Sequence, residues 1–140
     1  MVSNALLLVT AFLLALPVGW DREASTHSAG LRTFPLVALS SCAFVVIGLY
    51  AFGDDAVAQS RVLQGLVTGI GFVGGGAIVK SEDRVEGTAT AASVWTTGAI
   101  GATVAYGRLD LAVLLSAATF LTLRYLHRVA RVRDPEDREG

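Results

Sequence analysis

Charged side chains that could bind a ligand gather in short segments between long apolar runs. Asp21, Arg22 and Glu23 follow the first run, Arg32 precedes the second, and Glu86 precedes the fourth. If the runs form a bundle of helices, these charges should lie close together at one end of the bundle. Glu23 and Glu86 would suffice for Mg²⁺, which takes one or two protein carboxylates and keeps several waters. The alternative is a set of interfacial ion pairs that fix helix ends, each weak if exposed.

A second group of polar side chains lies inside the fourth apolar run, residues 88–107. This run is rich in hydroxyls, at Thr88, Thr90, Ser93, Thr96, Thr97 and Thr103. Such hydroxyls can bond carbonyls of their own helix or groups on neighbouring helices. They therefore predict either packing between helices or a weakly polar path for an ion or ligand.

The sequence shows no motif of an enzyme or a cofactor site. There is no P-loop and no H-E-x-x-H pair, and no serine has an obvious base partner. Gly69 to Gly74 matches the dinucleotide fingerprint in letters, but it lies in an apolar run and Val94, not an acid, follows 20 residues later. A net charge of −1 with 16% charged residues excludes a basic nucleic-acid binder. We predict no catalysis and no cofactor.

Five apolar runs supply the elements that would position these residues. They lie at 5–20, 34–52, 62–79, 88–107 and about 111–126, and only the last holds a charge, Arg124. A bilayer core of about 30 Å needs about 20 apolar residues in a helix, and no run shows the polar stripe of a soluble helix. We predict an all-α integral membrane protein, a compact bundle of about five transmembrane helices over residues 1–126. Residues 127–140 form a short charged tail.

The basic residues predict how this bundle is inserted. With five spans, the loops at 21–33 and 80–87 and the tail share one side, with two, two and five basic residues, nine in all. The other side has two, Arg61 and Arg108. The positive-inside rule places the N-terminus outside and the tail in the cytoplasm, with its arginines on anionic headgroups.

Glycines in the third run predict close helix packing. Gly65 with Gly69, and Gly71 with Gly75, form two small-xxx-small pairs that let helix backbones approach in lipid. The run is predicted to be the tightly packed centre of the bundle or the seam of a homodimer, and Trp95 is expected to pack against neighbours such as this run. The alternative is a helix broken at 74–76, whose freed backbone groups line a site.

Four motifs follow one another along the chain. They are Asp21-Arg22-Glu23, Ala29-Gly30-Leu31-Arg32-Thr33, the stretch from Thr68 to Gly74, and Val85-Glu86-Gly87 leading to Thr90 to Trp95. In order and spacing they resemble the MgtC/SapB family of bacterial membrane proteins. The resemblance implies a multi-pass protein of the bacterial plasma membrane, associated with adaptation to low magnesium and, in intracellular pathogens, with survival in host cells. Many members have a soluble C-terminal domain, whereas here we expect only the tail.

We predict a non-catalytic membrane protein that regulates other membrane proteins in adaptation to low magnesium. Candidate ligand or partner contacts are Asp21, Arg22, Glu23, Arg32, Thr33, Glu86, Thr90 and Ser93. The alternative is a magnesium or small-ion conduit, or a transporter subunit, although no ionisable side chain lies deep in a run, as ion-coupled transport normally needs. The expected partners are the lipid bilayer, other membrane proteins and a second copy of the chain; magnesium binding stays open.

Overall fold

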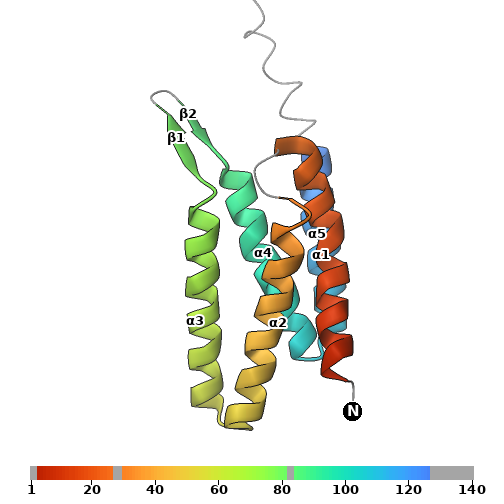
Figure 1. Cartoon of the computed structure of the whole chain (residues 1–140), viewed down its shortest axis with the longest axis vertical. Coiled ribbons are helices and arrows are strands. Elements are labelled where there is room, and N and C mark those ends of the chain that lie inside the picture. The colour runs from red at the N-terminus through yellow and green to blue at the C-terminus, as the bar shows by residue number, and fades with distance from the viewer. Residues whose placement is uncertain (1–2, 27–29, 82–83, 127–140) are drawn as a thin grey trace, which may run out of the picture.

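The computed structural model describes residues 3–26, 30–81 and 84–126. These ranges form α1 (Asn4–Thr26), α2 (Thr33–Phe52), α3 (Ala56–Gly75), β1 (Val79–Ser81), β2 (Arg84–Glu86), α4 (Thr88–Ala105), α5 (Leu109–Leu121) and a π-helical turn, η1 (Thr122–Leu126). Each helix runs antiparallel to the next, so the ends of α1 and α5 and the hairpin share one end of the bundle (Figure 1). The mostly helical fold agrees with the predicted class. The tail at 127–140 lies outside the described residues.

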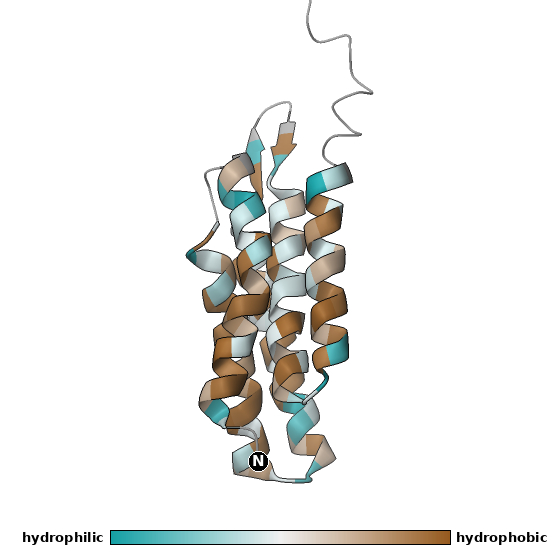
Figure 2. Cartoon of the chain, turned by 90° about the vertical axis from the view of Figure 1, so that its right-hand side faces the viewer, coloured by the Kyte–Doolittle hydropathy of each residue, from teal (hydrophilic) through white to brown (hydrophobic). Residues whose placement is uncertain are grey.

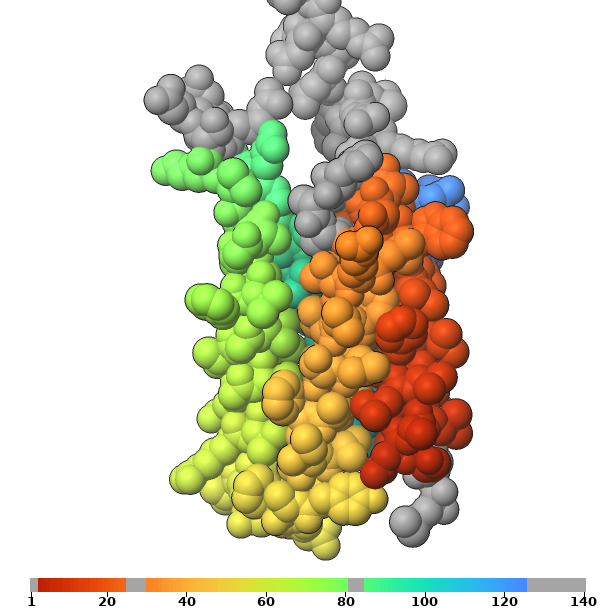
Figure 3. Space-filling view, in the orientation of Figure 1, coloured from red at the N-terminus to blue at the C-terminus, as the bar shows by residue number. Residues whose placement is uncertain are grey.

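Helix α4 is the centre of the bundle, because it packs against α1, α2, α3 and α5. Its glycines allow the close approach: a Cβ on Gly98 would overlap the side chain of Ile70, and a Cβ on Gly101 would overlap the backbone of Ala38. The prediction that the third run forms the centre is therefore wrong. Helix α3 lies at one edge of the bundle (Figures 1 and 3), and its residues are mostly exposed.

The ends of α3 differ from the apolar run that predicted it. The helix starts earlier because the Asp55 carboxylate accepts hydrogen bonds from the backbone N–H groups of Val57 and Ala58, each at 3.0 Å. It ends at Gly75, and the N–H groups of Ala77 and Ile78 donate to carbonyls of the last turn at 3.0 and 3.1 Å. The glycine stretch thus ends the helix, and its backbone is bonded within a turn.

A short β-hairpin replaces the end of the third predicted run. Strands β1 and β2 are antiparallel, with Val79 opposite Glu86 and Lys80 opposite Val85. Gly87 joins the hairpin to α4 with a φ of 84°, and a Cβ there would overlap the carbonyl oxygen of Ala77. The hairpin is therefore closely packed against the chain that leaves α3. Val79, which was predicted to be helical, lies in β1.

The outer surface of the bundle is apolar along its length. Leu13, Phe44, Ile47, Phe72 and Leu114 are all more than half exposed. Figure 2 shows apolar residues along the helices, with polar residues mostly towards the two ends. Such a surface is expensive in water and is expected of helices that face lipid.

Among the described residues, two helices are long and apolar enough to cross a membrane by length and hydropathy alone. They are the segment Asn4–Ala24 of α1 and the whole of α2. Helices α3 and α4 are less apolar because of their glycines, hydroxyls and amides, and α5 has 13 residues. Five transmembrane spans therefore stay a prediction.

Candidate functional site

Asp21 and Arg22 form a buried charged cluster at the end of α1, with 5% and 3% of their surfaces exposed. Arg22 Nη2 lies 3.1 Å from Asp21 Oδ2, and Arg124 Nη1 of η1 lies 3.9 Å from Asp21 Oδ1. The Arg124 guanidinium also lies 5.9 Å from the centroid of the Phe120 ring. The cluster therefore joins the first and last elements of the bundle.

Glu23 connects the end of α1 to the start of α2. Its Oε2 accepts a hydrogen bond from the backbone N–H of Leu31 at 3.1 Å. Gly30 lies against it so closely that a Cβ at Gly30 would overlap the Glu23 side chain and lie 2.8 Å from its Cα. A Cβ on Gly19, one turn earlier, would lie 3.3 Å from the Gly30 carbonyl oxygen. The Glu23 carboxylate therefore holds the turn between the first two helices.

Glu86 lies on β2 and is exposed. In the part of the chain that the structure describes, no hydrogen bond or ion pair joins it to Glu23 or Arg32. Within the same ranges, no group of three or more His, Cys, Asp or Glu side chains could hold a metal ion. The structure thus gives no support to Glu23 and Glu86 as a paired magnesium site.

Four of the six hydroxyls of α4 are bonded inside their own helix. Thr90 and Ser93 are buried, with 2% and 3% of their surfaces exposed. Ser93 Oγ donates to the Thr90 carbonyl at 2.8 Å, and Thr97 Oγ1 donates to the Ser93 carbonyl at 2.7 Å. Thr96 and Thr103 bond carbonyls of the same helix in the same way. This pattern favours packing over a polar path, because four of the six hydroxyl protons are already bonded to carbonyls of the helix.

Trp95 lies on the face of α4 that meets α3. Gly74 lies against Ala91 and Ile70 against Gly98, and Ala91, Trp95 and Gly98 follow one another at intervals of four and three residues, on one side of the helix. Trp95 is 52% exposed, so it presents half of its surface outside the bundle. Its packing against the glycine helix stays a prediction.

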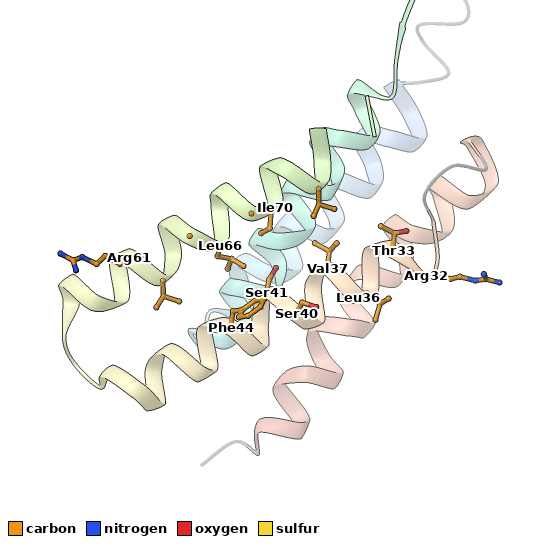
Figure 4. A pocket seen from close by; sticks show the side chains of 14 residues that line it. Arg32, Thr33, Leu36, Val37, Ser40, Ser41, Phe44, Arg61, Leu66 and Ile70 are labelled. Atoms are coloured by element: carbon orange, nitrogen blue, oxygen red, sulfur yellow. The ribbon is translucent and has the colours of Figure 1, made fainter. Parts of the chain in front are cut away.

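A groove of about 770 Å³ lies between α2 and α3. Between its ends the groove is lined mainly by apolar side chains, namely Leu36, Val37, Phe44, Leu66, Ile70 and Val73. Thr33 and Arg32 lie at one end, at the start of α2, and Arg61 lies at the other (Figure 4). Of the predicted contact residues, the groove therefore includes Arg32 and Thr33 but none of the charges at the end of α1.

Two serines and two glycines distinguish this groove from ordinary helix packing. Ser40 and Ser41 line it from α2 (Figure 4), and Ser41 is 1% exposed. Unlike Ser93 and Thr97 of α4, neither serine hydrogen-bonds to any residue that the structure describes. On the facing wall, no atom lies within 4 Å of a Cβ built on Gly65 or Gly69. Sequence reasoning missed the serines, although two adjacent serines in the middle of an apolar run were a visible signal.

The other predicted glycine pair, Gly71 and Gly75, does not line the groove. Both glycines are exposed, and a Cβ on either would meet nothing within 4 Å. None of the four glycines packs against another helix of the same chain. Their role in a homodimer seam stays a prediction.

At the opposite end of the bundle, Arg108 and Asp110 form an exposed ion pair. The Arg108 Nε and Nη2 atoms donate to the Asp110 carboxylate at 3.0 and 2.8 Å. These hydrogen bonds lower the pKa of Asp110, which precedes the apolar run that starts at Leu111, to about 2. One of the two basic residues on this side is thus paired with an acid.

Comparison with known proteins decides the family. The MgtC family model matches residues 8–132. This chain belongs to the MgtC family. It is 36% identical to protein SrpB of Synechococcus elongatus, over 89% of this chain and 75% of SrpB. It is 34% identical to the Escherichia coli protein named "Putative magnesium transporter YhiD", over 87% of this chain and 60% of YhiD. No solved structure matches the chain significantly.

This MgtC-family chain matches less than half of the length of the MgtC proteins of Brucella. It is 41% identical to MgtC of Brucella abortus over 70% of this chain but only 40% of that protein. The family resemblance that the four motifs predicted is confirmed. Family membership and the two apolar helices together indicate a membrane location.

Proposed function

We propose that this MgtC-family chain is a non-catalytic, multi-pass protein of the bacterial inner membrane that regulates other membrane proteins during adaptation to low magnesium. The link to magnesium rests on the family and on the name of its relative YhiD, which refers to magnesium transport.

The contrast between α4 and α3 supports a regulatory role. The central helix packs against the other four helices, and four of its six hydroxyls are bonded to its own carbonyls. Helix α3 lies at the edge, and a Cβ built on Gly65, Gly69, Gly71 or Gly75 would meet no other part of the chain within 4 Å. In lipid, such a small-residue surface favours contact with another helix, because close approach supplies dispersion energy. A protein with a packed interior and an open helix face is suited to binding partners in the membrane.

A magnesium conduit, or a subunit of one, is the second candidate, and the name of YhiD favours it. Its path would have to run along α4 or through the α2–α3 groove. Four of the six α4 hydroxyls are already bonded, and the groove is mainly apolar along its length. Neither feature offers the ring of oxygen ligands that a hydrated or partly dehydrated magnesium ion needs.

Magnesium flux into proteoliposomes that contain only this protein separates the two candidates. A regulator should give no flux above protein-free vesicles, while folded protein is confirmed by circular dichroism. Flux that Glu86→Ala or Arg32→Ala abolishes would overturn the proposal and make the protein a conduit. Where flux is absent, crosslinking in the native membrane should capture another membrane protein. Absence of any crosslinked partner would also contradict the regulator.

A further inference from the structure

We propose that the groove between α2 and α3 binds one anionic phospholipid, with its phosphate at Arg32 and an acyl chain along the groove. This inference rests on the membrane location of the chain and not on its regulatory role, so either can fail without the other. Three features carry it, namely the shape of the groove, the cation at its open end and the depth of that cation in the bundle.

The groove is closed at one end and open at the other. At the closed end α2 and α3 touch, since a Cβ on Gly48 would lie 3.1 Å from a Val62 methyl. Towards the hairpin the two helices separate, and α4 is visible between them (Figures 1 and 3). Along this part, a Cβ on Gly65 or Gly69 would meet no other part of the chain within 4 Å. An occupant therefore enters from the end at which Arg32 lies.

The open part of the groove has about the length of one lipid leaflet. The residues of α2 that line it run from Arg32 to Phe44, a stretch of helix that rises about 18 Å. The hydrocarbon of one leaflet is about 15 Å deep, half of a bilayer core of about 30 Å. A transmembrane helix would have to continue through the other leaflet, where the contact between Gly48 and Val62 closes the groove. The shape therefore favours an acyl chain over a helix.

Trp20 places Arg32 at the depth of lipid headgroups. A Cβ on Gly19 would lie 3.3 Å from the Cα of Leu31, so the neighbouring Trp20 is level with the start of α2. Trp20 is 68% exposed, and tryptophans on a membrane protein gather where the bilayer meets water. Arg32 follows Leu31 directly, and it therefore lies near the phosphates of the leaflet on that side.

The open end carries a positive charge that no neighbouring acid neutralises. Arg32 is exposed and makes no ion pair with any residue that the structure describes, and no acid lies in the first turn of α2. Its side chain extends outwards from the start of α2 (Figure 4). A guanidinium binds a phosphate through two parallel hydrogen bonds, and the Thr33 hydroxyl at the same end can donate a third.

The predicted orientation supplies the lipid. The distribution of basic residues predicts this end of the bundle in the cytoplasm. The cytoplasmic leaflet carries anionic lipids, which attract basic residues near the membrane surface. A lipid from that leaflet would present its phosphate to Arg32 while its acyl chain lies against the apolar walls formed by Leu36, Val37 and Leu66.

Native mass spectrometry of the full chain in detergent tests the headgroup contact. The added lipids are phosphatidylglycerol, which is anionic, and phosphatidylcholine, which is zwitterionic. The wild type should bind one phosphatidylglycerol more tightly than phosphatidylcholine. Arg32→Gln should weaken phosphatidylglycerol binding about fivefold, the effect of one arginine near a membrane surface, and should remove the preference between the lipids. Arg61→Gln, at the closed end of the groove, is the matched control and should change neither.

Gly69→Leu tests the position of the acyl chain. The leucine would fill space that the chain occupies, so binding of both lipids should weaken about fivefold or more, the usual effect of overpacking. Gly71→Leu is its control, because Gly71 does not line the groove, and it should bind both lipids as the wild type does. Both leucine variants should fold, since a Cβ on either glycine meets nothing within 4 Å. Thermal unfolding checks this, and Arg32→Gln remains informative if Gly69→Leu misfolds.

The proposal is wrong if the wild type binds no lipid or binds the two lipids equally well. Equal losses in Arg32→Gln and Arg61→Gln would also overturn it, because Arg32 would then not hold the phosphate. Unchanged lipid binding in folded Gly69→Leu, or an equal loss in Gly71→Leu, would place the lipid elsewhere on the surface. The groove would then be left to a helix of another protein or of a second copy.

Discussion

At position 30, a glycine brings the end of α1 into contact with the start of α2. We expect Gly30→Ala to destabilise the protein by about 1–3 kcal/mol, the usual cost of overpacking, because the new Cβ overlaps Glu23. The measurement is thermal unfolding in detergent. Gly71→Ala is the control, since its Cβ meets nothing within 4 Å and alanine favours the helix. Equal stability of Gly30→Ala and the wild type would show that the turn does not depend on this contact.

Asp21 holds two arginines at the same end of the bundle. Asp21→Ala removes the carboxylate that Arg22 contacts at 3.1 Å and Arg124 approaches at 3.9 Å. Breaking a buried ion pair costs about 3–5 kcal/mol, because a buried charge loses its partner. Denaturant unfolding should therefore show a large loss of stability for Asp21→Ala.

Asp110→Ala is the matched control for Asp21→Ala, because its ion pair with Arg108 is exposed and such pairs contribute little. The pKa of Asp110 is lowered to about 2 in the folded protein, against about 3.9 for a free aspartate. Any stability from this pair is therefore present above pH about 4 and is lost as the pH falls towards 2. If Asp110→Ala lost as much stability as Asp21→Ala, burial of the Asp21 ion pair would not be the reason for its contribution.

At the scale of elements, sequence predicts helices better than their packing. The absence of charge over residues 34–52 and 88–107 predicted α2 and α4 almost to their ends. The same criterion gave the wrong ends for α3. Asp55 caps the start of the helix, and Arg61 lies inside it although it is charged. The central position of α4 was not predictable, since small residues show that a helix can pack closely but not which helix it meets.

The same limit applies to the candidate site. The motifs identified Glu23 and Gly30, which do meet, but not their partnership through the Leu31 N–H group. The groove was missed because two adjacent serines in an apolar run mark a polar point on α2 but do not show which helix lies opposite them. Hydrogen bonding between distant elements is a property of the folded chain.

The hairpin depends on the conformation of one glycine. Gly87 and Gly107 both have positive φ, 84° and 73°, but only Gly87 lies against another part of the backbone, the carbonyl of Ala77. Alanine should cost about 1–2 kcal/mol at either position from the left-handed backbone alone. Gly87→Ala should cost more because of the clash, and limited proteolysis should cut its hairpin faster. Equal losses of stability in Gly87→Ala and Gly107→Ala would show that the contact with Ala77 does not affect stability.

At the scale of the whole molecule, the charge distribution predicts one orientation in the membrane. The turn after α1, the hairpin and the end of α5 share one end of the bundle, where the sequence predicts nine of the basic residues to gather. At the other end, Arg108 is paired with Asp110, which leaves Arg61 as the unpaired cation there among the described residues. The positive-inside rule counts this asymmetry near the membrane and places the hairpin in the cytoplasm.

Cysteine labelling tests that orientation directly, because the native Cys42 is buried and should give little background. Asp54→Cys, in the turn between α2 and α3, should react with a membrane-impermeant maleimide in right-side-out vesicles. Lys80→Cys, on the hairpin, should react only in inverted vesicles or after permeabilisation. Labelling of both positions from one side would mean that α3 does not cross the membrane, and the opposite pattern would place the hairpin outside. The first result would exclude the five-span bundle. The second would mean that any partner that binds through the hairpin lies outside the cytoplasm.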